Sequence, residues 1–449
     1  MCCARIQQIS KDIGSLKMCN MVLRQTVMLA CAVALVGCSE KSKITGHREL
    51  FLSGSKDISI DQDLANKPMN LPACQISKSN NQAGGSCTHV VNHQCFDVTN
   101  AKKLFKIFIG RETNYKERFL SNLVIHNGVA FGGTPSGRVF ALDLASRKLL
   151  WRTPLARRID DSVKIGGVAV ASDGNIIATT ALGNIVLLDA KTGHVKKSIN
   201  IDCAIRSAPT ISGNYVLVQG SNNSLYVLND HLNVLWTKEE VPGNLLFLGN
   251  CSPSVDKGIV FAAYSTGEYK AYDLNTGYEL WFDYIVSQFQ NDGVGNLLHI
   301  YASQVVSDDT VFTLSHGGQL VANHCLSGSR IWSVAFSGLY RPAVIGEWLF
   351  AVDENAFVYC FNKTTGHTRW YTQLPKNENN VMPVKWTKPI VAGNAVILVT
   401  DYGDIVCLDA STGRNIRTIK SDIKNPSDAV VLDCTLYVLT DRGYVHAFR

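Results

Sequence analysis

The 449-residue sequence has no apolar run near the roughly 18 residues that a membrane-spanning helix needs. It has few prolines, 12 against 35 glycines, and only 18% of its residues are charged, whereas 46% are hydrophobic. This balance excludes a disordered chain and predicts a globular one with a large core. The formal net charge of +6 is modest, and lysine and arginine do not cluster with aromatic residues, so we predict no nucleic-acid partner.

The sequence also lacks the short motifs of several enzyme classes. It contains no Gly-x-Ser-x-Gly, His-Glu-x-x-His or Gly-x-x-x-x-Gly-Lys motif, so hydrolase, metalloprotease and nucleotidase functions have no support. We therefore predict no enzyme activity, no catalytic residue and no cofactor. Four histidines fall in predicted turns or loops, where exposure to solvent is the simpler interpretation: His194, His231, His316 and His367.

An apolar run at residues 26–37 has the length of the hydrophobic region of a secretory signal. It ends in "LVGCSE", which resembles the bacterial lipobox, so we predict a lipoprotein signal peptide at residues 1–37 and lipid attachment at Cys38. Ser39 resembles the outer-membrane sorting pattern, which places the protein at the outer membrane, facing the periplasm. A soluble secreted protein is the alternative. Two internal methionines are alternative start positions: Met18 and Met21.

Residues 38–102 are polar and contain glycine, asparagine and serine without a sustained helical or strand period. We predict a flexible, lipid-anchored tether that holds the following domain away from the membrane.

The predicted tether contains "CTHVVNHQC" at residues 87–95. Its two thiols and two imidazoles are a weak candidate for a zinc or copper site, although the spacing matches no standard metal motif. A disulfide between two of three nearby cysteines is the simpler interpretation for an exported protein. The candidate ligands are Cys87, His89, His93 and Cys95, and the third cysteine for a disulfide is Cys74. Nine cysteines follow Cys38, so at least one is unpaired.

From residue 103 the chain is a repeat array. Eight copies of one pattern begin 38 to 51 residues apart, which is the period of a four-stranded propeller blade. We therefore predict an all-β domain, an eight-bladed β-propeller, at residues 103–449. The copies occupy residues 137–151, 183–197, 223–236, 267–281, 318–332, 356–370, 403–417 and 443–449.

Each copy predicts a hairpin of the third and fourth strands. The segment "RVFALD" alternates with period two, the Thr-Gly pair of "LNTG" or "AKTG" supplies a turn with positive φ, and "YELW" returns antiparallel. The tryptophans at equivalent positions are predicted to wedge between neighbouring blades: Trp151, Trp236, Trp281, Trp332 and Trp370. Cys360 and Cys407 replace alanines of other copies and are predicted to be small core residues.

The last copy stops at Arg449 after its third strand. Residues 103–110, "KLFKIFIG", have the pattern of a fourth strand. We predict that this N-terminal strand pairs with the C-terminal strands in one blade, which closes the propeller without an exposed ring edge.

The repeat Gly-x-Val-x-Ala-x-Asp-x-x-Thr-Gly-x-x-x-Trp resembles the propeller family first described in pyrroloquinoline quinone (PQQ) dehydrogenases. Together with the lipobox and a single propeller, the chain resembles more specifically the BamB-type lipoproteins of the β-barrel assembly machinery. The resemblance implies a non-catalytic scaffold that binds the periplasmic repeat domains of the central barrel-assembly protein. It also implies contact with unfolded outer-membrane proteins, and attachment to the membrane through the lipid anchor only.

In that family the partner contacts lie on loops of neighbouring blades, ahead of a Ser-Ala-Pro motif and of a later Thr-Pro-like motif. The matching segments here are "IDCAIRSAP" and "LFLGNCSP". The family usually has two aspartates in the second loop, which this chain replaces with leucine and asparagine. Ordinary solvated loops are the alternative. The residues carried over as tentative partner contacts are Ile201, Cys203, Arg206, Leu248 and Asn250.

Two other functions share the predicted fold. A PQQ-dependent dehydrogenase needs calcium ligands, an aspartate base and often adjacent cysteines, and the chain has no adjacent cysteines after the signal. A propeller that binds another envelope protein or a polysaccharide has the same sequence features as the scaffold.

Overall fold

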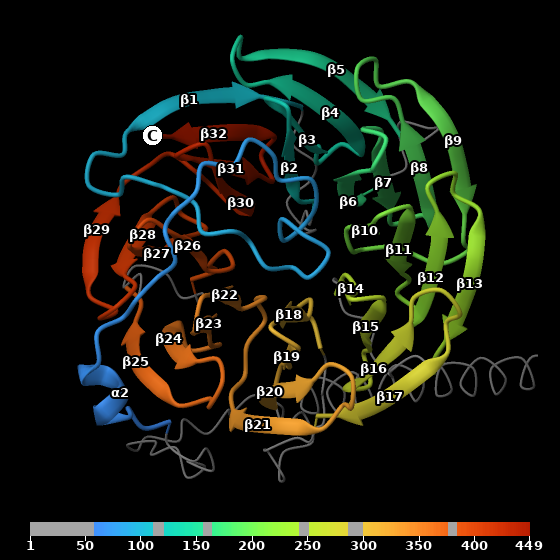
Figure 1. Ribbon diagram of the computed structural model, residues 1–449. Helices are drawn as coiled ribbons and strands as arrows, with labels where there is room; N and C mark the ends of the chain where they lie inside the picture. The colour runs from blue at the N-terminus through green and yellow to red at the C-terminus, as the bar shows by residue number, and fades with distance from the viewer. Residues whose placement is uncertain (1–57, 111–120, 156–163, 242–250, 286–299, 376–383) are drawn as a thin grey trace, which may run out of the picture. The chain divides into compact units, whose positions relative to one another are not determined.

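The computed structural model describes residues 58–110, 121–155, 164–241, 251–285, 300–375 and 384–449. The described part of the unit Gly54–Arg449 forms eight four-stranded sheets. The sheets follow one another around a central axis as the blades of a propeller (Figure 1). The predicted eight-bladed β-propeller is therefore confirmed. Within the described ranges, no helix is long and apolar enough to cross a membrane.

The strands of each blade are antiparallel, and the first strand of a blade lies innermost (Figure 1). From blade one to blade eight, each from the centre outward, the strands are β2 (Leu123–His126), β3 (Val129–Gly133), β4 (Arg138–Asp143), β5 (Lys148–Pro154); β6 (Ile165–Val170), β7 (Ile176–Thr180), β8 (Asn184–Leu188), β9 (Val195–Asn200); β10 (Thr210–Ser212), β11 (Tyr215–Gln219), β12 (Ser224–Asn229), β13 (Val234–Glu239); β14 (Ser254–Asp256), β15 (Ile259–Ala263), β16 (Glu268–Asp273), β17 (Glu279–Tyr284); β18 (Val305–Ser307), β19 (Thr310–Leu314), β20 (Gln319–His324), β21 (Arg330–Ala335); β22 (Ala343–Ile345), β23 (Trp348–Val352), β24 (Phe357–Asn362), β25 (Thr368–Gln373); β26 (Ile390–Ala392), β27 (Ala395–Val399), β28 (Ile405–Asp409), β29 (Asn415–Ile419); and β30 (Pro426–Leu432), β31 (Thr435–Thr440), β32 (Tyr444–Phe448), β1 (Lys103–Phe108).

The hydrophobic core lies between the blades. All residues of the second strands β7, β15 and β27 are buried, because each blade is covered on both faces by its neighbours. The predicted alternation is therefore wrong for an inner strand such as β4, where four consecutive residues are buried, and holds in the outermost strand β5. Cys360 and Cys407 are fully buried in this core, as predicted, and burial raises the pKa of Cys407 to about 12.

The eighth blade combines strands from both ends of the propeller domain. β1 pairs antiparallel with β32, with Phe108 opposite Tyr444 and Ile107 opposite Val445. The two strands lie side by side in Figure 1. The backbone N–H of Ile109 adds a 2.9 Å hydrogen bond to the carbonyl of Gly443, so the pairing continues past the end of β1.

Residues 58–102, here called the strap, do not hang free from the propeller. They lie across the blades around the central axis (Figure 1). Helix α2 (Gln62–Asn66) packs beside β25, where the Arg369 guanidinium donates hydrogen bonds of 2.6 Å to the carbonyls of Leu64 and Lys67. The predicted flexible tether is therefore wrong for residues 58–102, while residues 38–57 and the predicted signal peptide lie outside the described residues.

The strap forms hydrogen bonds with the first strands of the blades, through its backbone and, at Gln82, through a side-chain amide. Such bonds reach the first strand, or the turn after it, in blades one, two, three, four, five, seven and eight. In blade six, Pro72 lies against the equivalent turn at Gly346. A segment without its own sheet or long helix is ordered in this way because its polar backbone groups find partners at exposed strand ends. The bonded pairs are Asn80–Ile125, Asn81–Val170, Gln82–Ile211, Cys87–Val255, Thr88–Val306, Gln94–Gly393 and Ser77–Asp433.

A disulfide joins Cys74 to Cys95 inside the strap, which confirms the prediction of a disulfide within this cysteine group. The bond closes a loop with a sequence separation of 21 residues. The adjoining residues also pair, because Gln75 N–H donates to the carbonyl of His93 at 2.7 Å. The disulfide therefore closes a loop that contains the strap's contacts with blades one to five, seven and eight.

We expect the double variant Cys74→Ser/Cys95→Ser to loosen the strap. Loss of a crosslink of this length costs about 2–3 kcal/mol, so amide hydrogen exchange in the strap should accelerate about 30- to 150-fold. The free cysteine Cys87 is the matched control, and Cys87→Ser should leave exchange nearly unchanged. Equal exchange in the double variant and the wild type would contradict the role given to the disulfide.

Candidate functional site

The strap occupies one face of the propeller. In each antiparallel blade, the turns after the first and third strands lie at this face, and it is here called the strap face. The turns after the second strand, and the loops that lead to the next blade, therefore lie at the other end of the strands. This end is here called the opposite face. Residues 201–209, which connect β9 to β10, belong to the opposite face.

The first predicted contact loop is anchored to the blade beneath it. Ile201 donates its backbone N–H to the carbonyl of Gly183 at 3.0 Å, and its side chain packs against the core with Tyr226. The Cys203 thiol is half-buried against Gly220, and burial raises the pKa of this thiol. Arg206 is partly exposed and makes contacts with its surroundings. Ile201 and Cys203 are thus mainly structural, and Arg206 is the better candidate for a contact.

Three exposed residues beside this loop were missed by the sequence analysis. Asp202 is exposed and has a φ of 54°, which directs its carboxylate outward from the tight loop. Leu182 is 51% exposed in the turn after β7, and Asn200 holds this turn with a 2.8 Å hydrogen bond to the Leu182 carbonyl. Val241, in the loop after β13, is 78% exposed. The available signal was an apolar residue beside glycine or proline in two predicted turns.

The second predicted contact loop follows Val241 along the chain. Leu248 and Asn250 lie outside the described residues. Cys251, the next residue in the sequence, is buried, and burial raises its pKa to about 12. The two predicted loops are thus successive connections between neighbouring blades, and both lead from a fourth strand to the first strand of the next blade.

The five predicted tryptophans lie between neighbouring blades. Each donates its indole N–H to a carbonyl in the turn between the third and fourth strands of the next blade. Each ring also covers the glycine of that turn, where a Cβ atom would collide with it. These contacts fit the structural role predicted for the tryptophans. The bonds are Trp151 to Ala190 at 3.0 Å, Trp236 to Leu274 at 2.9 Å, Trp281 to Cys325 at 2.7 Å, Trp332 to Lys363 at 2.9 Å and Trp370 to Ala410 at 2.9 Å.

The four weak candidate ligands in the strap do not form one metal site. Cys95 is bonded to Cys74, which removes one thiolate. The two ring nitrogens of His93 lie 2.6 Å from the carbonyls of Pro72 and Gly393. His89 Nδ1 lies 2.8 Å from the carbonyl of Gln304. Among the described residues, no group of three or more histidine, cysteine, aspartate or glutamate side chains is arranged to hold a metal ion.

The four loop histidines do not share one environment. His194, His231 and His367 are exposed, as predicted. His316 is only partly exposed, and its Nδ1 lies 2.5 Å from the Glu354 carboxylate, which raises the pKa of this histidine. This pair is a surface contact between blades five and six.

Comparison with known proteins gives one family model that matches residues 135–372, more than half of the chain, described as "Outer membrane protein assembly factor BamB". The protein of that name from Moranella endobia is 26% identical over 302 residues, which cover 66% of this chain and 78% of the relative. Its namesake from Yersinia pestis is 24% identical over 325 residues, 71% of this chain and 81% of the relative.

Solved structures show similarity in fold. BamB from Moraxella catarrhalis matches with a TM-score of 0.66 at 18% identity, covering 78% of this chain and 99% of that one. A quinohemoprotein alcohol dehydrogenase from Comamonas testosteroni matches with a TM-score of 0.64 at 12% identity, covering 87% of this chain and 82% of that one. At these identities both likenesses concern the propeller fold alone.

Proposed function

The chain belongs to the family of the outer membrane protein assembly factor BamB, and from this premise we propose that it is a non-catalytic scaffold in outer membrane protein assembly. It binds the periplasmic repeat domains of the central barrel-assembly protein and helps to present unfolded outer-membrane proteins for insertion. Lipid attached to Cys38 anchors it to the outer membrane, on the periplasmic side. The family match and the propeller support the general role, and the surface of the opposite face supports the docking site.

The observation that carries the proposal is that the strap covers one face of the propeller and leaves the other uncovered among the described residues. The strap covers the inner strand ends on one face, so a partner finds the unoccupied loops of the described chain on the other. There, exposed Leu182 and Val241 supply apolar surface, and Asp202 and Arg206 supply charges of both signs. An apolar centre with a charged rim is the usual composition of a protein-binding surface.

We expect Leu182→Asp to weaken binding to the isolated periplasmic repeat domains about 10-fold or more, because it places a charge in the apolar part of the contact. Isothermal titration calorimetry measures the effect. The matched control is Leu326→Asp, since Leu326 is 68% exposed but lies in a turn of the strap face. The control should bind within about 2-fold of the wild type, and circular dichroism should show both variants folded.

A second experiment separates the function from the site. Recovery of the barrel-assembly protein from crosslinked envelopes by the tagged wild type tests the function, and Arg206→Ala and Asn250→Ala test the two loops. Normal binding by all three opposite-face variants would retain the function and overturn the site. If the folded wild type recovers only other envelope proteins or a polysaccharide, the assembly function is wrong.

A further inference from the structure

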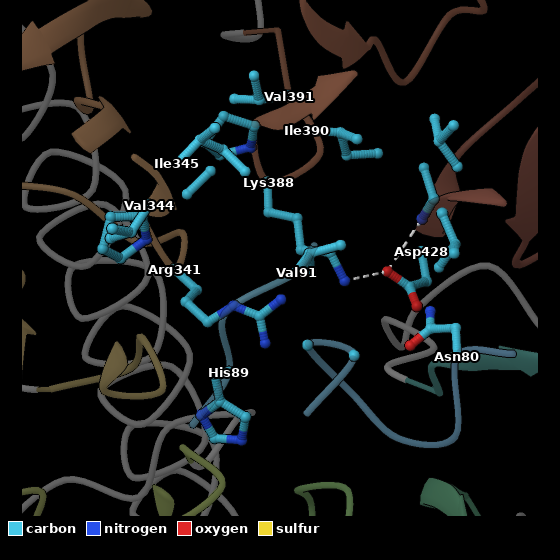
Figure 2. A pocket seen from close by; sticks show the side chains of 18 of the residues that line it. Asn80, His89, Val91, Arg341, Val344, Ile345, Lys388, Ile390, Val391 and Asp428 are labelled. Carbon is cyan, nitrogen blue, oxygen red and sulfur yellow. Dashed lines mark hydrogen bonds and ion pairs between the residues drawn. The ribbon is translucent and has the colours of Figure 1, made fainter. Parts of the chain in front are cut away.

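A cavity lies between the strap and the first strands of blades six, seven, eight and one. It leaves about 40 Å³ for the centres of water-sized molecules, which is room for a few waters or one small ion. The strap contributes Gly84 and His89, and the blades contribute Arg341, Lys388 and Asp428. Figure 2 shows the Arg341 and Lys388 side chains entering the cavity from different elements, with His89 on the strap side of the guanidinium.

Among the described residues, Asp428 is the only carboxylate that lines this cavity, and three hydrogen bonds already engage it. Asp428 Oδ1 accepts from Lys388 Nζ at 2.5 Å and from the Ala429 N–H at 2.9 Å. Its Oδ2 accepts from the Leu123 N–H at 2.9 Å. One of the dashed contacts in Figure 2 joins Lys388 to Asp428. Lys388 and Asp428 therefore neutralise each other, and the positive charge of Arg341 is not balanced by a second carboxylate lining the cavity among the described residues.

Arg341 has no hydrogen-bond or ion-pair partner among the residues that the structure describes. Burial lowers its pKa to about 10, so the guanidinium keeps its charge at neutral pH. The backbone of Gly84 lies directly beside it, and a Cβ atom at Gly84 would overlap the guanidinium. The glycine in the strap thus leaves room for the Arg341 guanidinium, but the strap provides it with no hydrogen-bond acceptor within the described ranges. The side chain is partly exposed, and a cation partly withdrawn from bulk water without a partner is unfavourable.

The other polar groups do not supply the missing negative charge. His89 is buried, and burial lowers its pKa to about 3, so its ring is neutral at physiological pH. Nδ1 of this ring is engaged with the Gln304 carbonyl. Asn80 is neutral, and its buried side-chain oxygen has no hydrogen-bond partner within the described ranges. A water molecule next to a bound ion can donate to this oxygen.

We propose that this cavity binds one small monovalent anion, such as chloride or formate, on the guanidinium of Arg341. The charge follows from two cations and one carboxylate, which leave a single positive charge. The size of the anion is inferred from the volume of the cavity, which has room for a halide or a three-atom carboxylate but not for a sugar acid. The ion neutralises the Arg341 guanidinium where Gly84 of the strap lies against it, and therefore stabilises the docked strap.

The test measures melting temperature in increasing sodium chloride or sodium formate, with sodium gluconate holding the ionic strength constant. The wild type should gain about 2–4 °C between trace and saturating small anion. Arg341→Gln should lose this gain, and Arg341→Lys should keep part of it. Arg138→Gln is the matched control, because Arg138 is exposed on the surface, and it should respond as the wild type does. Equal responses of wild type and Arg341→Gln would overturn the proposal.

A second measurement does not depend on the folding of the variants. Crystals of the wild-type protein grown in sodium bromide should give an anomalous-scattering peak in the cavity within about 3.5 Å of the Arg341 guanidinium. Ordered water there, without a bromide peak, would show that solvent alone satisfies Arg341 and would overturn the proposal.

Discussion

Replacing Trp370 by alanine is expected to lower the free energy of unfolding by about 3–5 kcal/mol, the usual cost of removing a buried aromatic side chain. Trp370 is only 5% exposed, and its indole donates a 2.9 Å hydrogen bond to the Ala410 carbonyl of the next blade. The ring also covers Gly413 and lies 6.0 Å from the ring of Phe350. The substitution therefore opens a cavity between blades six and seven and leaves a carbonyl without its donor. Urea denaturation monitored by circular dichroism measures the effect.

The adjacent residue provides the control for this prediction. Tyr371 belongs to the same strand, is also aromatic and is 41% exposed. Tyr371→Ala should cost about 1 kcal/mol or less, because little of the ring is removed from water. A similar loss of stability in both variants would show that the strand itself, rather than the contact between blades, is sensitive to substitution. Trp370→Phe should fall between the two, since it keeps an aromatic ring but loses the hydrogen bond.

Replacing Asp428 by alanine is expected to lower the free energy of unfolding by about 3–5 kcal/mol, as much as the tryptophan variant, because it leaves the partly buried Lys388 ammonium without its carboxylate. Asp428 links three blades: it accepts from Lys388 in blade seven, lies in β30 of blade eight and accepts from the Leu123 N–H at the start of blade one. Its loss places the charges of Lys388 and Arg341 in one cavity with no carboxylate. Thermal and urea denaturation should both report the loss.

Two comparisons test the cause of this effect. Asp422 also contacts two lysines, Lys103 at 2.5 Å and Lys106 at 2.9 Å, but it is half-exposed, so Asp422→Ala should cost at most about 1 kcal/mol. Combining Asp428→Leu with Lys388→Met should recover much of the stability that Asp428→Ala loses, because it removes both charges of the pair. Equal losses in the two aspartate variants would contradict the role assigned to burial.

The strap also sets the reach of the predicted membrane anchor. Because the chain is bound to the propeller from about residue 58 onward, only residues 38–57 remain between the predicted lipid at Cys38 and the first described contact. A fully extended chain of this length spans at most about 70 Å. With the proposed lipid at Cys38, the propeller would be held closer to the membrane than by a flexible tether of residues 38–102.

The sequence alone determined the blades. Their number, their hairpins and the positions of the tryptophans follow from interactions within one repeat or between successive repeats, and such local patterns recur visibly along the chain. The turn and the tryptophan recur at a fixed spacing in several copies, so the contact between Trp370 and the Gly413 turn of the next copy could be anticipated. The strand pairing of β1 with β32 was predictable for the same reason, because a missing fourth strand at one end matched a spare strand at the other.

Only the tertiary structure decided the course of the strap and the content of the cavity. The strap has no period in its sequence, because its backbone is satisfied by strand ends of many blades rather than by its own neighbours. Arg341, Lys388 and Asp428 are separated by about 40 residues each, and nothing near any of them in the sequence indicates the others. They meet because each occupies an innermost position of a successive blade, and the ring brings these positions to one axis.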